Sequence, residues 1–546
     1  MLPAAPMSRK LLLLLMLAAA AACTPQDSTV DLPKAMVLSV RVNDVQMLNG
    51  GSLTGVSTSP GIRVEFSRAA SLEPSNIAFS GGELKGEADP ADPAVITFRP
   101  AAELSPATKY QFEIPAGEAF GVNLIEGFSI SFTTAYDRSD KFPRISDEEL
   151  LTLVQKQSFK YFWDYAHPVS GLARERLGSG ETVTSGGSGF GIMTIPMAVE
   201  RGFITRAEAA ERMRTIVDFL STKADRFHGA FPHWLNGTSG AVIPFSANDN
   251  GGDLVETGFL IQGLLAAAGY FDSPEEEDIR SGIDAIWRDV EWDWYTRGGQ
   301  DVLYWHWSPY SDWVMNMQIS GWNEALICYV LAAASPTHTV PASAYHKGWA
   351  RNGGIKNGRK FYDITLPLGS DLGGPMFFAH YSFLGLDPRG LKDTYADYWE
   401  QNVAHARINH AYCAANPKGN GYSAQCWGLT ASDIPKGYAA SSPTNDKGVI
   451  APTAALASMP YTPDESIAAM KEFYYVYGDR LWGEYGFHDA FCPGSIWFAS
   501  SYIAIDQGPI AVMIENYRSG LLWNCFMKHP DVANGLEKLG FSSPQH

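Results

Sequence analysis

The chain has 546 residues and a formal net charge of -18, from 59 acidic and 41 basic side chains. This length is enough for two or three domains with large cores. The acidic balance argues against a nucleic-acid partner, which would require a basic surface, and it suits a neutral or cationic ligand better than a polyanion.

The first residues resemble a bacterial lipoprotein signal. Arg9-Lys10 is a short basic segment, residues 11–17 are an apolar core, and Ala20-Ala-Ala-Cys23 resembles a lipobox. We therefore expect residues 1–23 to be a signal peptide with Cys23 as the lipidated residue, followed by a tether over 24–35. An ordinary signal peptide with a chance cysteine is the alternative. The expected location is the periplasm or the outer membrane, with the lipid as the only membrane contact.

Residues 36–136 are predicted to form a small all-β domain. Short segments such as Ile62-Arg-Val-Glu-Phe and Tyr110-Gln-Phe-Glu-Ile alternate apolar and polar residues, and Gly, Pro, Asn and Asp separate them. This spacing indicates a β-sandwich of about seven strands, and the closing Ser131-Phe-Thr-Thr134 resembles bacterial immunoglobulin-like modules. We expect a spacer or packing partner here, with carbohydrate binding as the alternative, and then a charged linker over 137–144.

From residue 145 to residue 546 the periodicity is helical, and two kinds of segment alternate. The amphipathic, charged kind covers 147–166, 206–224, 275–291, 391–411, 463–477 and a stretch from 519. The other kind is apolar nearly all round, as in buried helices, and covers 189–200, 253–268, 320–334, 375–383, 449–459 and 503–517. Strict alternation predicts an all-α (α/α)6 barrel, with a solenoid of helical pairs as the competitor. In the barrel, the loops before the buried helices line one funnel.

Carboxylates lie at these loop-to-helix junctions. Asp253 and Glu256 are three residues apart and share one helix face. Glu256 and Glu324 each fall in the first turn of an apolar helix, where a charge is costly unless it is paired or useful. Such a position can raise a carboxyl pKa and produce a general acid. Asp253 and Asp506 are explained equally well as helix caps.

Aromatic residues make up 12% of the chain, with 15 Trp, and many lie in the same loops. Their flat rings can stack on sugar rings, although large helical domains also bury many aromatics in their cores. The motifs HExxH, CxxC and GxSxG are absent from the sequence, so we expect no metal, no cofactor and no Ser/His/Asp hydrolase. Cys413 and Cys426 could close a short disulfide loop or remain two buried thiols.

Several motifs resemble the bacterial glucoamylase-like family, which includes glycoside hydrolase family 144. The first is Tyr161-Phe-Trp-Asp164, continuing to Gly171-Leu-Ala-Arg-Glu175. The resemblance covers about residues 145–540 and implies an (α/α)6 barrel. The other matching motifs are Asp253-Leu-Val-Glu256-Thr, Gly321-Trp-Asn-Glu324-Ala, Ser335-Pro-Thr-His338, His380-Tyr-Ser-Phe-Leu-Gly-Leu-Asp387-Pro, Cys426-Trp-Gly-Leu-Thr-Ala-Ser-Asp433 and Ala504-Ile-Asp-Gln-Gly-Pro-Ile510.

The resemblance implies a glycoside hydrolase acting on β-glucan, in particular β-1,2-glucan or its oligosaccharides, with inversion of configuration. Such hydrolysis requires two carboxyl groups. We expect Glu256 to be the general acid and either Asp446 or Glu324 to be the second, ionised group. The candidate substrate-binding residues are Asp164, Glu175, Trp234, Asp253, Trp322, His380, Tyr381, Trp427 and Arg518.

Two other functions fit parts of the pattern. A polysaccharide lyase could use His380 or Tyr381 as its base and Arg518 to neutralise a uronate, although the carboxylate-rich loops disfavour this. A non-catalytic glycan-binding lipoprotein would keep the aromatic residues without needing Glu256. In every case we expect a monomer that binds sugar and no nucleic acid.

Overall fold

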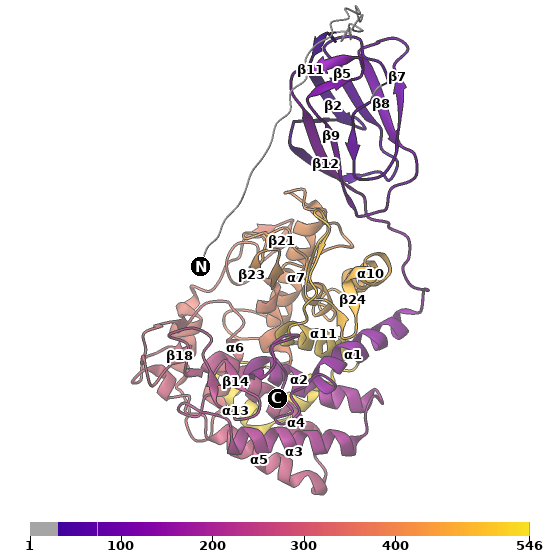
Figure 1. Ribbon diagram of the computed structural model, residues 1–546. Helices are drawn as coiled ribbons and strands as arrows, with labels where there is room; N and C mark the ends of the chain where they lie inside the picture. Colours follow the sequence, from indigo (N-terminus) through magenta and orange to yellow (C-terminus); the bar gives the residue numbers. More distant parts are fainter. Residues whose placement is uncertain (1–30, 74, 545–546) are drawn as a thin grey trace, which may run out of the picture. The chain divides into compact units, whose positions relative to one another are not determined.

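The computed structural model describes residues 31–73 and 75–544, and the chain divides into two compact units, Met1–Ala135 and Tyr136–His546 (Figure 1). The signal sequence, Cys23 and most of the expected tether lie outside the described residues. Among the residues that are described, no helix is long and apolar enough to cross a membrane.

The first unit is a β-rich sandwich, as predicted. A five-stranded sheet has the order β3-β2-β5-β8-β7, a four-stranded sheet has the order β4-β12-β9-β6, and a small sheet has the order β1-β11-β10. Alternate residues of β9, namely Tyr110, Phe112 and Ile114, point into the core. The strands are β1 Lys34–Ala35, β2 Val37–Val42, β3 Val45–Met47, β4 Gly51–Val56, β5 Ile62–Phe66, β6 Ala78–Phe79, β7 Leu84–Ala88, β8 Val95–Pro100, β9 Lys109–Ile114, β10 Gly117–Ala119, β11 Val122–Leu124 and β12 Phe128–Thr134.

The expected linker packs on the helical unit. The backbone N–H of Lys141 donates to the carbonyl of Tyr475 at 2.7 Å, and the ring of Phe142 lies 4.6 Å from that of Tyr474. Arg138 pairs with the buried Glu472 at 2.5 Å. Residues 137–144 therefore belong to the second unit, because their aromatic and basic side chains find partners on it.

The second unit is helical. Its α-helices are α1 Asp147–Trp163, α2 Ser185–Glu200, α3 Arg206–Thr222, α4 Leu254–Tyr270, α5 Glu277–Arg288, α6 Leu326–Ala334, α7 Tyr398–Ala415, α8 Pro452–Leu456, α9 Pro463–Lys471, α10 Gly478–Leu481, α11 Ala504–Arg518, α12 Leu521–Met527 and α13 Pro530–Leu539. Shorter helical turns are η1 Pro274–Glu276, η2 Trp294–Thr296, η3 Ala344–Trp349, η4 Arg351–Gly353, η5 Met376–Ala379, η6 Tyr381–Phe383 and η7 Glu472–Val476. All twelve predicted segments contain helix.

Short strand pairs fill the loops of this unit. They are β13 Thr182–Thr184, β14 Trp234–Asn236, β15 Val242–Ile243, β16 Gly252–Asp253, β17 Leu303–Tyr304, β18 His306–Trp307, β19 Gln318–Ile319, β20 Lys360–Phe361, β21 Ile364–Thr365, β22 Ala431–Ile434, β23 Gly437–Ala440, β24 Trp482–Gly483, β25 Gly486–Phe487, β26 Phe491–Cys492 and β27 Trp497–Phe498. The helical periodicity did not predict them, because each is only two to four residues long.

The two kinds of helix differ in burial as their sequences require. The amphipathic helices begin with polar caps, such as the reciprocal Ser146–Glu149 hydrogen bonds that start α1. Helices α2 and α4, which are apolar nearly all round, are buried along almost their whole length. The apolar face of each amphipathic helix then covers this inner set.

The buried segments contact one another in succession. Helix α2 packs on α4 and on α11, α4 packs on α6, α6 packs on η6, and α11 packs on α8. His380, between η5 and η6, hydrogen-bonds through Nε2 to Ser458 Oγ at 3.0 Å, and Tyr461 donates to the carbonyl of Ala379 at 3.0 Å. The segment that follows α8 therefore meets the η5–η6 segment, so the two ends of the succession lie together.

Residues 375–383 form two short 3-10 turns in place of the predicted single helix. The chain enters through Gly373 and Gly374, which have φ of +90° and +93°. Beyond them, Gln262 of α4 donates to the carbonyl of Tyr381 at 3.0 Å and accepts from the N–H of Gly385 at 2.8 Å. Backbone groups that bond to this side chain are not available to continue a helix.

The described cysteines are all free and buried. Cys413 and Cys426 are two separate thiols, so the second of the two sequence-based alternatives holds.

Glycines set the spacing between α2 and α4. A Cβ atom at Gly189 would lie 2.2 Å from the carbonyl oxygen of Phe259, and a Cβ at Gly263 would lie 2.1 Å from the carbonyl oxygen of Gly189. Backbone atoms stand in both places, so a methyl group could fit only if the two helices moved apart.

We expect Gly189→Ala to lower the free energy of unfolding by about 3 kcal/mol or more, because the methyl group overpacks two buried helices. Urea denaturation followed by circular dichroism measures this. Gly540→Ala is the matched control, since Gly540 has φ of +78° but no atom within 4 Å of its Cβ position, and it should cost about 1 kcal/mol. Equal losses in the two variants would contradict tight helix packing.

Candidate active site

A cavity of about 500 Å³ lies at the ends of the buried helices where the sequence predicted a funnel. Its walls come from the junctions before α2, α4, α6 and α11, from η5 and η6, and from the hairpin β22–β23. The residues lining it are Glu175, Arg176, Thr184, His233, Trp234, Phe245, Glu256, Phe259, Trp305, Glu324, Phe377, Tyr381, Ala431, Tyr438, Ala440, Ile503 and Ile505. Three glutamates, Glu175, Glu256 and Glu324, therefore face a cavity walled largely by aromatic rings.

Glu256 stands in the first turn of α4 and is nearly buried. Its Oε2 accepts a hydrogen bond from the N–H of Gly186 at 2.8 Å and a longer one from Thr184 Oγ1 at 3.4 Å. A Cβ at Gly186 would lie 2.5 Å from this oxygen, so only glycine allows the contact. Burial raises the pKa of Glu256, and the nearby His233 opposes that shift.

Glu324 precedes α6 and is partly exposed to the cavity. Burial raises its pKa to about 7, and the negative charges of Glu256 and Asp253 act in the same direction. No other described residue donates a hydrogen bond to its side chain. Its backbone carbonyl, in contrast, is fixed by the hydroxyl of Ser382. Glu324 can therefore hold a proton near neutral pH.

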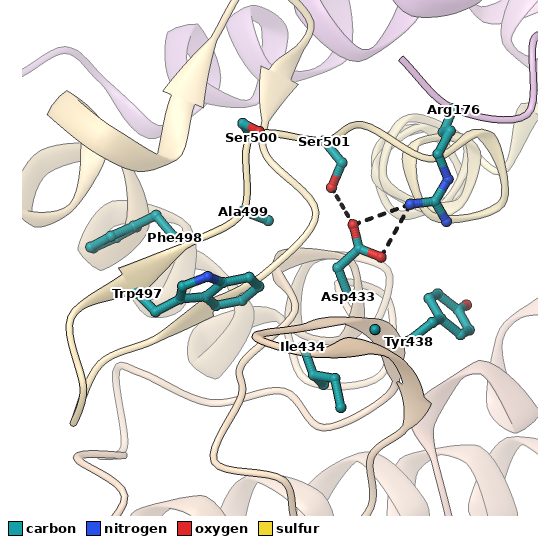
Figure 2. A pocket seen from close by; sticks show the side chains of 10 residues that line it. Arg176, Asp433, Ile434, Tyr438, Trp497, Phe498, Ala499, Ser500 and Ser501 are labelled. Atoms are coloured by element: carbon teal, nitrogen blue, oxygen red, sulfur yellow. Dashed lines mark hydrogen bonds and ion pairs between the residues drawn. The ribbon is translucent and has the colours of Figure 1, made fainter. Parts of the chain in front are cut away.

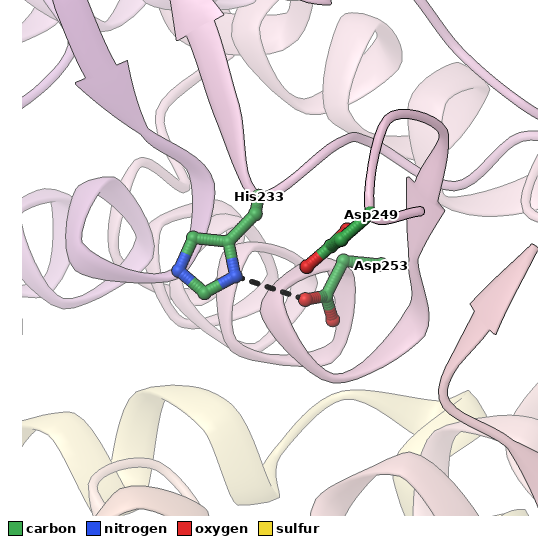
Figure 3. Close-up of side chains that lie close together, drawn as sticks. All are labelled: His233, Asp249 and Asp253. Carbon is green, nitrogen blue, oxygen red and sulfur yellow. Dashed lines mark hydrogen bonds and ion pairs between the residues drawn. The ribbon is translucent and has the colours of Figure 1, made fainter. Parts of the chain in front are cut away.

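Asp253 links Glu256 to two histidines. Its Oδ1 caps α4 by accepting from the N–H groups of Val255 and Glu256, both at 3.0 Å. Its Oδ2 lies 3.0 Å from His233 Nδ1 (Figure 3). Burial lowers the pKa of His233, but the carboxylates of Glu256 and Asp253 outweigh it and raise that pKa to about 9.

One group of side chains has the spacing of metal ligands. His233, Asp249 and Asp253 each offer a ligand atom, and these atoms lie within 4.8 Å of one another (Figure 3). The HExxH-type search of the sequence missed this group, because its members come from different loops.

A second hollow of about 480 Å³ adjoins the first, and Arg176 and Tyr438 line both. Arg176 donates to Asp433 at 3.2 and 3.3 Å, and Ser501 donates to the same carboxylate at 2.5 Å (Figure 2). The ring of Trp497 lies on the other side of this hollow (Figure 2). A charged, hydrogen-bonding wall therefore faces an aromatic one.

Two buried aspartates lie behind this second hollow. Asp489 accepts from the backbone N–H of Asp433 at 2.6 Å. Asp506, in the first turn of α11, is buried, and no donor group of the described residues bonds to either of its oxygens. Burial and the mutual repulsion of the pair raise the pKa of Asp489 to about 7 and that of Asp506 well above its usual range. One proton held between the two carboxyls removes this repulsion.

Four of the predicted substrate-binding residues lie in or beside the main cavity. Glu175, Trp234 and Tyr381 line it, and Asp253 lies directly behind Glu256. Glu175 is paired with Arg176 at 3.1 Å, so it also orients the arginine that the two hollows share.

The structure does not bring Asp446 to this cavity. Its carboxylate accepts four hydrogen bonds, from Tyr422 at 2.7 Å, Gly448 N–H at 2.9 Å, and Tyr412 and Asn420 at 3.0 Å. Asp446 therefore holds a loop together, and the prediction that it is a catalytic carboxylate is wrong.

Three other candidates are packing or anchoring residues. Trp427 is fully buried, and its Nε1 donates to the carbonyl of Glu465 at 3.1 Å. Trp322 packs against Phe383 and Tyr398. Asp164 caps the end of α1 and is exposed.

Of the residues expected for a lyase, Tyr381 lines the cavity but His380 and Arg518 do not. His380 is buried against Tyr461, and burial lowers its pKa to about 3. Arg518 ends α11, about 20 Å along the helix from Ile505 at the cavity, and it donates to Gln155 at 2.6 Å. His380 and Arg518 therefore stabilise the helical unit.

Sequence reasoning missed several residues of the site. Arg176, His233 and Asp433 fall within or beside quoted motifs, but nothing local separates them from ordinary surface residues. Tyr438 lies in a hairpin that helical periodicity does not reveal. Only Asp506 could be recognised as a site candidate from the sequence, because it is a carboxylate at the start of an apolar helix. The same position was explained equally well by a helix N-cap.

The comparisons with known proteins agree with this geometry. A family profile described as "Putative glucoamylase" matches residues 316–530, and one described as "Bacterial Ig-like domain" matches residues 46–134. The chain is 47% identical over 420 residues to an exo β-1,2-glucooligosaccharide sophorohydrolase (non-reducing end) of Parabacteroides distasonis. That alignment covers 72% of this chain and 58% of the relative, so the chain spans less than two thirds of that protein.

Two solved structures are similar over their whole length. A Bacteroides uniformis protein that carries the same glucoamylase description is 60% identical, with a TM-score of 0.73, and the match covers 74% of this chain and 100% of that one. An endo-β-1,2-glucanase from Chitinophaga pinensis, solved with sophorotriose and glucose, is 53% identical, with a TM-score of 0.72 and coverage of 74% and 100%.

The raised pKa of Asp489, in the Asp489–Asp506 pair, predicts that stability depends on pH. Between about pH 4 and pH 7 the folded protein keeps a proton on Asp489 that the unfolded chain releases, so this carboxyl lowers the free energy of unfolding as pH rises. We expect Asp489→Asn to remove much of that fall, so that the variant gains stability relative to the parent as pH rises through this range. Urea denaturation at pH 4.5 to 8 measures it. Asp218→Asn, on the exposed face of α3, should give a curve parallel to the parent, and a parallel curve for Asp489→Asn would refute the assignment.

Proposed function

We propose that this chain, which belongs to the bacterial glucoamylase-like family that includes glycoside hydrolase family 144, hydrolyses β-1,2-glucan or its oligosaccharides. The observation that carries the proposal is that Glu256 and Glu324 line one aromatic-walled cavity. The relatives named as a sophorohydrolase and an endo-β-1,2-glucanase support the substrate.

Inverting hydrolysis requires a protonated carboxyl beside the leaving oxygen and an ionised carboxylate beside a water. Glu324 suits the acid, because burial raises its pKa to about 7 and no other described residue donates a hydrogen bond that would favour its ionised form. Glu256 suits the carboxylate, because Gly186 and Thr184 donate to it and His233 stands nearby. These roles are the reverse of those expected from the sequence, where Glu256 was the acid.

The walls of the site match a glucan chain. Trp234, Trp305 and Tyr381 offer ring faces on which sugar rings can stack. Arg176 and Asp433 offer donors and acceptors for hydroxyl groups in the adjoining hollow. We propose that successive glucose units occupy the two hollows, with the bond to be cleaved beside Glu256 and Glu324.

We also propose that the helical unit is an (α/α)6 barrel. The succession of contacts among α2, α4, α6, η5–η6, α8 and α11, with the hydrogen bond from His380 to Ser458, supports a closed inner ring. The cavity at one end of these helices is what such a ring produces.

The proposed setting of the enzyme is outside the cytoplasm. The basic and apolar segments before Cys23 support an exported lipoprotein that is acylated there and acts as a monomer in the periplasm or at the outer membrane. Loss of radiolabelled palmitate incorporation in Cys23→Ala tests the acylation.

We expect Glu324→Gln and Glu256→Gln each to reduce kcat on β-1,2-glucan by about 10²- to 10⁴-fold, because each removes a group that exchanges a proton in the transition state. Reducing-end assays and product chromatography measure this. Asp446→Asn is the matched control, since it alters a partly buried carboxylate outside the cavity and should keep most of the activity of the folded protein. Near-normal turnover by folded Glu324→Gln would remove Glu324 as the acid. If both glutamine variants keep full sugar binding and the parent shows no hydrolysis, the chain is a glycan-binding protein.

The acid assignment also predicts a pH dependence. Glu324 must be protonated to act, so kcat/KM should fall as pH rises through about 7. Initial rates on β-1,2-glucooligosaccharides from pH 5 to pH 9 measure the profile. A rate that stays constant between pH 6 and pH 8 would contradict the assignment, and products absorbing in the ultraviolet would indicate a lyase.

A further inference from the structure

Behind the wall of the main cavity, two imidazoles and two carboxylates converge on one small space. His233, Asp249 and Asp253 place ligand atoms within 4.8 Å of one another (Figure 3). His306 lies beside this set, with Nε2 at 3.6 Å from Asp249 Oδ2 and 3.7 Å from Asp253 Oδ2. We call these four residues the His/Asp cluster.

The backbone holds the cluster in place before any ligand arrives. Strands β16 and β18 pair with Asp253 opposite His306. The N–H of Asp253 also donates to the carbonyl of Phe231 at 2.9 Å, near His233. A Cβ at Gly252 would lie 2.0 Å from the hydroxyl of Tyr295, so glycine is needed for this close approach of segments.

Two members of the cluster are buried without hydrogen bonds. His306 is 8% exposed, and neither of its ring nitrogens makes a hydrogen bond to any part of the chain that the structure describes. Its Nε2 points between the two carboxylates, yet at a distance too long for a hydrogen bond. Asp249 is 5% exposed, and its carboxylate accepts no hydrogen bond from the same residues. Buried polar groups almost always have a partner. The fully buried atom without one is His306 Nδ1, whereas Nε2 and the carboxylates meet at ion-pair distance at the centre of the cluster.

The spacing and the donor types fit a metal ion. In a tetrahedral site with metal–ligand bonds of about 2.1 Å, the ligand atoms are about 3.4 Å apart. The separations here are 3.0 Å between His233 Nδ1 and Asp253 Oδ2, and 3.6 and 3.7 Å from His306. Two imidazoles with two carboxylates suit a zinc-type divalent cation, whereas calcium takes six to eight oxygens.

We propose that His233, Asp249, Asp253 and His306 bind one divalent transition-metal cation of the zinc type. In the alternative state, a proton on His233 bridges it to Asp253 and the cluster binds no ion. The ion would contact Asp253 through Oδ2, while Oδ1 continues to cap α4 below Glu256. Its role would therefore be to stiffen the first turn of α4 and the β16–β18 pair, and the ion takes no part in bond cleavage.

The test uses the full chain without a histidine tag, stripped with a chelator and dialysed. Isothermal titration with Zn²⁺ and elemental analysis after gel filtration give affinity and stoichiometry. We expect about one zinc per chain and a rise in Tm on adding zinc. Asp249→Asn and His306→Gln, which do not line the cavity, should each weaken zinc binding at least about tenfold, and circular dichroism checks that they fold.

His338→Gln is the matched control, because His338 pairs with Asp293 at 3.0 Å on the surface and should leave zinc binding unchanged. If His306→Gln fails to fold, His306→Asn is tested in its place. No stoichiometric zinc on the parent chain, or equal zinc affinity in the parent and in both folded cluster variants, would overturn the proposal. Binding is measured without sugar, so the result is independent of whether the chain hydrolyses glucan.

Discussion

The contact on which the site depends is the hydrogen bond from the N–H of Gly186 to Glu256. It joins the first turns of α2 and α4, the two buried helices that approach most closely through Gly189 and Gly263. A carboxylate at the start of an apolar helix is costly to bury unless backbone donors meet it. Close packing of α2 on α4 therefore has a chemical consequence, because it supplies a donor that favours the ionised form of Glu256 and opposes the rise in pKa caused by burial.

Compensation of buried negative charge also determines the arrangement of the rest of the cavity wall. Arg176 lies between Glu175 and Asp433 and lines both hollows, so one cation compensates two acidic groups while facing the ligand space. Where no cation is present, as at Asp489 and Asp506, a carboxyl pair keeps a proton. These buried or partly buried acids are therefore compensated in different ways: Arg176 pairs with Glu175 and Asp433, the N–H of Gly186 donates to Glu256, and Asp489 and Asp506 keep a proton. Chemistry at the site can use these differences in protonation.

The sequence revealed what is encoded locally. Each of the twelve predicted segments contains helix, although residues 375–383 form two short 3-10 turns. Glu256 and Glu324 both line the cavity as predicted, but Glu324 precedes α6 and does not lie in its first turn. In the sequence, Asp446 could not be distinguished from Glu256 and Glu324 as a catalytic candidate. In the folded chain, Tyr412, Asn420 and Tyr422 donate hydrogen bonds to its carboxylate, and these contacts exist only after folding. His306 meets Asp253 only because two two-residue strands pair across more than fifty residues. No local pattern records such a pairing.

The free thiols have a practical consequence. Because the described cysteines are reduced and enclosed by side chains, the domains require no oxidative step to reach their final form, and they should fold equally well in a reducing cytosol and in an oxidising compartment. A thiol-reactive dye can reach these sulfurs only when the surrounding helices open. The rate of dye labelling would therefore report how often different parts of the helical unit open under native conditions.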